Sequence, residues 1–89
     1  MSNPDSNVVF IDVKSYASFA GDPDLTAASE SACRAPARGF RAKSAGNFSF
    51  INAAGVTRTI PMANEELLLC QIKSIVTATT TITAGVVGW

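Results

Sequence analysis

The stretch NFSFINAAGVTRTIP, residues 47–61, decides the fold class. Phe48 and Phe50 alternate with other residues, so an extended segment places both rings on one face. Residues 53–55 end in glycine and suit a turn. Residues 56–60 alternate again and are rich in β-branched side chains, which favour strands. The stretch therefore predicts two antiparallel strands joined by a tight turn.

Similar short segments flank this hairpin, and they extend the prediction to an all-β fold. We expect strands at 39–43 and 80–89, with 39–43, 48–52 and 56–60 forming a three-stranded meander. Pro61 marks a strand end or an edge, because proline cannot donate to a ladder. The predicted fold is a small antiparallel β-sandwich or barrel of about five to six strands. Its predicted core consists of Phe48, Phe50, Ile60, Leu68, Ile72, Val76 and Ile82.

Residues 65–76 fit two kinds of element. As a helix, they begin after the capping residue Asn64 and carry Glu65 and Glu66 in the first turn. As a strand, they place alternate apolar side chains on one face. The residues alone favour neither element, so both remain open.

The first third of the chain has a different composition. Residues 1–36 hold three of the four prolines and many small polar residues, with one brief apolar run at 8–13. We predict an extended N-terminal arm over 1–36 and a compact β domain over 37–89. A domain of this size buries little apolar surface alone, so we expect the arm to contact a neighbouring molecule.

Charge is divided between these regions, although the net charge is zero. Residues 1–30 carry five acids and one base, a balance of minus four. Residues 31–60 carry five bases and no acid, a balance of plus five. Such opposed blocks pair either within one chain or between neighbouring copies.

Catalytic and cofactor chemistry has little support in the sequence. The chain has no histidine, which removes histidine catalysis and histidine metal ligation. It contains neither GxxxxGK[ST] nor GxGxxG, the patterns that cradle phosphates. Glu65 and Glu66 are adjacent, so their carboxylates point to different sides of a helix or strand. We predict a protein that is not an enzyme and has no cofactor and no metal.

The cysteines and apolar runs bear on the compartment. Cys33 and Cys70 fit neither a CxxC metal pair nor a dense disulfide framework, so we predict reduced thiols, with a bridge between them as the alternative. No apolar stretch approaches the roughly 20 residues that span a bilayer, and residues 1–6 do not resemble a secretory signal. We expect synthesis in a cytoplasm and no membrane partner.

The candidate functional residues form a protein interface. The basic cluster consists of Arg34, Arg38, Arg41 and Lys43. It can bind the carboxylates of a protein partner, form a solvated face or bind nucleic acid, and the zero net charge of the chain argues against nucleic acid. Trp89 either closes the end of the domain or anchors a neighbouring subunit. The predicted interface residues are Arg34, Arg38, Arg41, Val8, Phe10 and Trp89.

A series of short motifs runs from residue 33 to the end: Cys33 with Arg34, Ala45 with Gly46, Ala54 with Gly55, Ile75 with Val76, Thr80 with Thr81, and the closing residues 85–89. Their order resembles that in the small spike-base and decoration proteins on the heads of tailed bacteriophages and gene transfer agents. The chain departs from the family at Thr79, where a glycine is usual, and at Leu67 or Leu68, where a proline is common.

The resemblance implies a β-rich virion structural protein, made in the host cytoplasm and bound to the outer capsid surface. There it would stabilise capsomers or seat a spike or fibre, with the major capsid protein and copies of itself as partners. It also favours a strand over residues 67–76. The alternatives are a tail or neck adaptor and a receptor- or glycan-binding β module. Pentamer, trimer and monomer all remain open.

Overall fold

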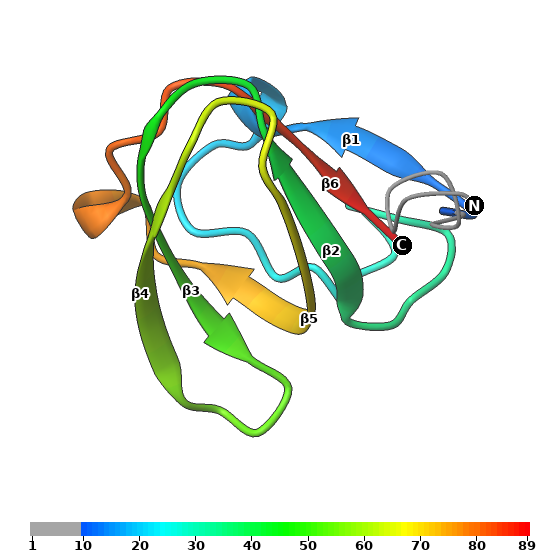
Figure 1. Ribbon diagram of the computed structural model, residues 1–89. Coiled ribbons are helices and arrows are strands. Elements are labelled where there is room, and N and C mark those ends of the chain that lie inside the picture. Colours follow the sequence, from blue (N-terminus) through cyan, green and yellow to red (C-terminus); the bar gives the residue numbers. More distant parts are fainter. Residues whose placement is uncertain (1–9) are drawn as a thin grey trace, which may run out of the picture.

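The computed structural model describes residues 10–89, which form one antiparallel sheet of six strands that is not closed (Figure 1). Two short 3₁₀ turns are its other regular elements among these residues. The all-β prediction is therefore confirmed. The strands are β1 (Val13–Ser15), β2 (Ala37–Ala42), β3 (Gly46–Asn52), β4 (Thr57–Met62), β5 (Leu67–Ile75) and β6 (Gly85–Gly88), with 3₁₀ turns at Tyr16–Ser18 and Thr77–Thr79.

The strands lie in the order β1-β6-β2-β5-β3-β4. The predicted hairpin is present, with Phe48 of β3 opposite Ile60 of β4. In its turn, the Asn52 side chain accepts hydrogen bonds from two backbone amides, and Gly55 adopts φ 84°, a value that favours glycine.

The predicted three-stranded meander is wrong, because β5 lies between β2 and β3. β5 has nine residues, so one end pairs with β2 and the other with β3. The register shifts on both sides of β5, and Figure 1 shows the strand bending between its two halves. The strand alternative for residues 65–76 is correct, and the helix alternative is wrong.

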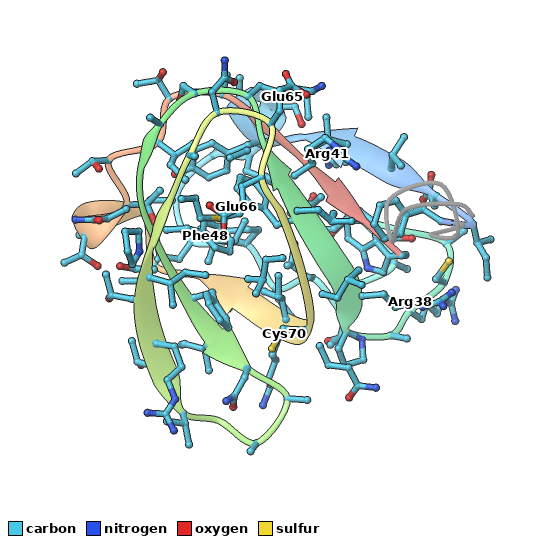
Figure 2. The ribbon with its side chains drawn as sticks, in the orientation of Figure 1. Arg38, Arg41, Phe48, Glu65, Glu66 and Cys70 are labelled. Atoms are coloured by element: carbon cyan, nitrogen blue, oxygen red, sulfur yellow. The ribbon has the colours of Figure 1, made fainter. Side chains whose placement is uncertain are left out.

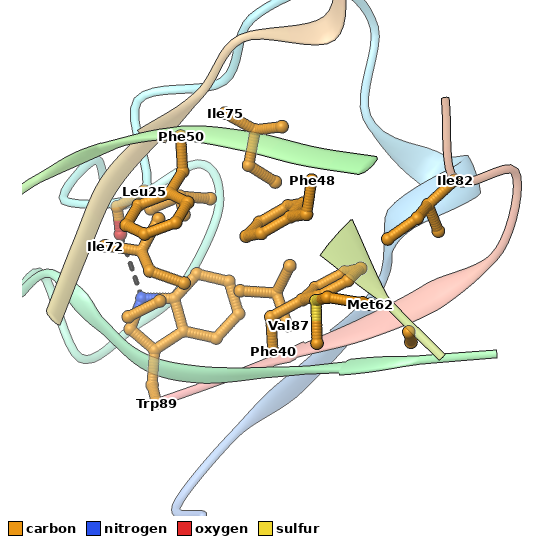
Figure 3. Close-up of a cluster of buried hydrophobic side chains, with 12 residues drawn as sticks. Leu25, Phe40, Phe48, Phe50, Met62, Ile72, Ile75, Ile82, Val87 and Trp89 are labelled. Carbon is orange, nitrogen blue, oxygen red and sulfur yellow. Dashed lines mark hydrogen bonds between the residues drawn. The ribbon is translucent and has the colours of Figure 1, made fainter. Parts of the chain in front are cut away.

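The bend in β5 brings the two halves of the sheet face to face across the core (Figure 3). Phe40 of β2 stacks on Phe48 of β3, with ring centroids 4.0 Å apart and an interplanar angle of 3°. Among the predicted core residues, Ile60 and Leu68 are partly buried against the cluster, and Val76 is half-buried. The core comprises Leu25, Ala37, Phe40, Ala42, Phe48, Phe50, Met62, Ile72, Ile75, Ile82, Val87 and Trp89.

The last predicted strand is shorter than expected, since β6 covers only part of residues 80–89. Residues 80–84, which precede β6, form isolated hydrogen bonds instead of a ladder. Thr80 Oγ1 accepts from the amide of Ser49 at 3.0 Å, and the Thr81 amide donates to the carbonyl of Asn47 at 2.9 Å. This segment therefore crosses from β3 to the edge of β2 and links the two halves of the sheet.

Residues 10–36, which we call the N-terminal segment, pack on the sheet and differ in this from the predicted extended arm. β1 pairs with β6, and Leu25 is fully buried in the core. Asp24 forms a bridge with Ser74, so this segment continues the sheet beyond the start of β2. The core therefore extends beyond strands β2 to β6, because Leu25 packs beside Trp89. Leu25 is a single apolar residue in a polar stretch, so the sequence pattern did not mark it as a core residue.

Candidate protein-docking surface

The outer face of the sheet carries exposed apolar side chains from its first strands. Val13, Gly88, Gly39 and Leu69 form one row across β1, β6, β2 and β5, because each is the cross-strand partner of the next. Val13 and Leu69 are each 56% exposed. An aliphatic residue therefore faces solvent at each end of a row whose centre is two glycines.

Phe10 lies over these two glycines. A Cβ atom added at Gly88 would come within 2.4 Å of the Phe10 ring, and one added at Gly39 within 3.2 Å of it. Only glycine allows the ring to approach the backbone this closely. The predicted interface residue Phe10 is thus half-buried against its own sheet, while Val8 lies outside the described residues.

A hollow of about 310 Å³ opens beside this row. Ile11 is 79% exposed at its rim, and Arg38 projects outward from the start of β2 (Figure 2). Arg34, also exposed, lies in the chain between two lining residues. We call this site the basic hollow. Its lining residues are Ile11, Cys33, Ala35, Pro36, Arg38, Gln71 and Trp89.

We define the outer-face patch as Phe10, Val13 and Leu69. Its exposed members, Val13 of β1 and Leu69 of β5, are distant in sequence. Sheet pairing through β6 and β2 brings them to one face. Exposed aliphatic residues gathered in this way are typical of a surface that another protein covers.

Trp89 closes the core and does not project from the surface. Its side chain is 1% exposed, and its Nε1 donates to the carbonyls of Leu25 at 2.9 Å and Ala35 at 3.0 Å (Figure 3). Of the two interpretations offered for this residue, the structural one fits. The indole ties the N-terminal segment to β6 and forms part of the floor of the basic hollow.

The basic cluster divides between the two ends of β2. Arg41 is half-buried, and its Nη1 donates to the carbonyl of Glu65 at 3.0 Å. Lys43 forms a 2.8 Å ion pair with the Glu65 carboxylate. Figure 2 shows Arg41 and Glu65 in the upper part of the view and Arg38 lower, on its right side. Of the basic cluster, Arg34 and Arg38 are therefore the residues that lie at the basic hollow.

A second hollow, of about 320 Å³, contains two carboxylates of the N-terminal segment. Asp22 accepts from the amide and hydroxyl of Thr77, and these hydrogen bonds lower its pKa below 3.8. The hydroxyl and amide of Thr26 lower the pKa of Asp24 in the same way. We call this site the acidic hollow, and its lining residues are Asp22, Asp24, Ile51, Gly55, Lys73 and Ser74.

The acidic hollow was not predicted. The sequence showed only that acids are frequent in residues 1–30, and two of those acids hydrogen-bond to threonines instead of to the basic block. The Asp24 bond is local, and an aspartate two residues before a threonine is a recognisable turn signal. The Asp22 bond reaches Thr77, a distance in sequence that no local pattern indicates.

The aromatic residues available for sugar stacking are engaged inside the molecule. Tyr16 packs edge-on against Phe40 at 6.1 Å, and Trp89 is buried. The two cysteines are free and half-buried, in agreement with the prediction of reduced thiols. Among residues 10–89, no group of three or more cysteine and acidic side chains gathers as a metal would require.

The comparisons with known proteins gave no match to a protein-family model, a curated protein or a solved structure. Within the described part of the chain, no helix has the length and apolar character needed to cross a membrane. The candidate site therefore depends on the geometry of the outer-face patch and the two hollows.

Proposed function

We propose that this chain is a virion structural protein, a head decoration or spike-base protein of a phage or gene transfer agent that docks on the outer capsid surface. The observation that carries the proposal is the outer-face patch. Its exposed aliphatic side chains recommend a protein partner. A spike or fibre seated on the docked protein is part of the same proposal.

The energetics of the patch favour docking. Burial of an exposed aliphatic side chain contributes about 1.5–3 kcal/mol, and Val13 and Leu69 are both more than half exposed. We therefore expect apolar burial against the major capsid protein to hold the complex.

The order of short motifs over residues 33–89 supplies the second argument. It resembles the head spike-base and decoration proteins, whose function requires a β-rich domain that binds without catalysis. The all-β fold is compatible with that role. Fold alone does not imply function, so the proposal needs a binding experiment.

The proposal is tested by cosedimentation of the purified protein with heads of the particle whose genome encodes it. Leu69→Asp places a charge in the outer-face patch. Val56→Asp is the matched control, because Val56 is 40% exposed on the β3–β4 hairpin and outside the patch. Circular dichroism establishes that both variants are folded.

We expect the wild-type protein and Val56→Asp to pellet with heads, and Leu69→Asp to remain in the supernatant. Equal binding by Leu69→Asp would exclude the outer-face patch as the contact. Binding to tails and not to heads would favour the adaptor alternative. If the wild-type protein binds no part of the particle, the proposed function is wrong.

A further inference from the structure

We infer that the basic hollow of one copy docks on the acidic hollow of a second copy of this chain. The inference rests on the proposed function and deepens it, because it identifies how decoration proteins would contact one another on the shell. It is carried by the complementary chemistry of two hollows that share no lining residue.

The basic hollow combines an apolar surface with positive charge. Ile11 is 79% exposed at its rim, and Trp89 and Pro36 form part of its lining. The guanidinium of Arg38 borders it, with the exposed Arg34 nearby in the chain. A partner that fits this site has aliphatic groups beside fixed carboxylates.

The acidic hollow has that chemistry. Asp22 and Asp24 each accept two hydrogen bonds at Oδ1, which fixes their orientation. The hollow also contains the aliphatic side chain of Ile51. Lys73 offsets part of the charge, so two carboxylates and one ammonium group leave the hollow net negative.

Charge decides which surfaces meet. A basic hollow on a basic hollow would bring arginines together, and two acidic hollows would bring carboxylates together, so both like-charged pairings are unfavourable. The pairing of a basic hollow with an acidic hollow joins opposite charges and buries Ile11 near Ile51. Because each copy offers both hollows, this contact can repeat from copy to copy and close into a ring.

The test uses the full chain and native mass spectrometry at low ionic strength, where screening is weak. Arg38→Glu reverses the charge of the basic hollow. The double variant Asp22→Asn and Asp24→Asn removes both negative charges from the acidic hollow and keeps an oxygen acceptor for each threonine. Arg58→Glu is the matched control, since Arg58 is exposed on β4 and lines neither hollow.

We expect oligomers from the wild-type protein and from Arg58→Glu, and at least about tenfold weaker self-association from each hollow variant, since loss of one good charged contact is worth roughly that factor. Mixing the two hollow variants should restore 1:1 complexes, because one intact basic and one intact acidic hollow remain. A monomeric wild-type protein, or a mixture without 1:1 complexes, would overturn the inference.

Head binding is measured separately by cosedimentation. Self-association without head binding would contradict the proposed function and support this contact. Head binding by a protein that stays monomeric in solution and does not respond to the hollow variants would contradict this contact and leave the proposed function in place.

Discussion

Trp89 joins two parts of the chain that are far apart in sequence. Its indole Nε1 donates to the carbonyls of Leu25 and Ala35, so one side chain is bonded to two points of the connection between β1 and β2. Leu25 is fully buried in the same core. These two residues make the N-terminal segment part of the folded unit.

Replacement of Trp89 by phenylalanine tests this role. Trp89→Phe leaves two carbonyls without their donor and removes part of a buried ring, so we expect a loss of about 2–4 kcal/mol in the free energy of unfolding. Urea titration at neutral pH measures the change. Leu69→Ala is the control, because Leu69 is exposed and its truncation should cost about 0.5 kcal/mol or less. Equal losses would show that Trp89 has no anchoring role.

Asp22 links stability to acid pH. Its hydrogen bonds with Thr77 lower its pKa below 3.8, so the folded state binds this proton less readily than the unfolded state does. The resulting stabilisation is complete above the unfolded pKa and is lost as pH falls through the folded pKa. We expect urea midpoints to decrease from about pH 5 to pH 2, and less steeply in Asp22→Asn. An unchanged slope in that variant would contradict this contribution.

At the residue scale, alternation identified some core positions and missed others. The period of two around Phe48 and Phe50 indicated their shared buried face, and both rings are buried there. Leu25 is a single apolar residue among polar neighbours, so no periodicity marked it. The interface candidates were chosen by residue type. Phe10 lies in the outer-face patch, Arg34 and Arg38 lie at the basic hollow, and Arg41 bonds to Glu65 at the other end of β2.

At the element scale, local signals located strands better than they located strand partners. The β3–β4 hairpin has a turn signal inside the sequence, and its strands were predicted to within two residues of their observed ends. The insertion of β5 between β2 and β3 is a long-range pairing, and no local pattern specifies it. Residues 80–84 have strand-favouring side chains, but their threonines bond to β3 and the turn after β2 instead of entering a ladder.

Deletion of residues 1–30 tests the N-terminal segment as an element. It removes β1 and Leu25, and it opens one side of the core beside Trp89. We expect the truncated chain to be unfolded at room temperature, so that circular dichroism shows no cooperative transition on heating. A folded, soluble truncated domain would instead support the extended arm that the sequence suggested.

At the scale of the whole molecule, zero net charge conceals a spatial separation. The acidic hollow is on the side of the molecule formed by residues 22–24 and β5, and the basic hollow lies between residues 33–38 and Trp89. The sequence showed opposed charge blocks. Folding places Asp22 and Asp24 in one hollow and Arg38 in the other, each beside apolar residues. A small domain with two such surfaces is suited to bind a shell and adjacent copies of itself.

The proposed position on the head is tested most directly by electron microscopy of particles produced with and without this chain. We predict extra density on the outer surface of the head in the particles that contain the chain, with the outer-face patch of the fitted domain turned toward the capsid. Identical head surfaces in the two preparations would show that the chain does not decorate the head.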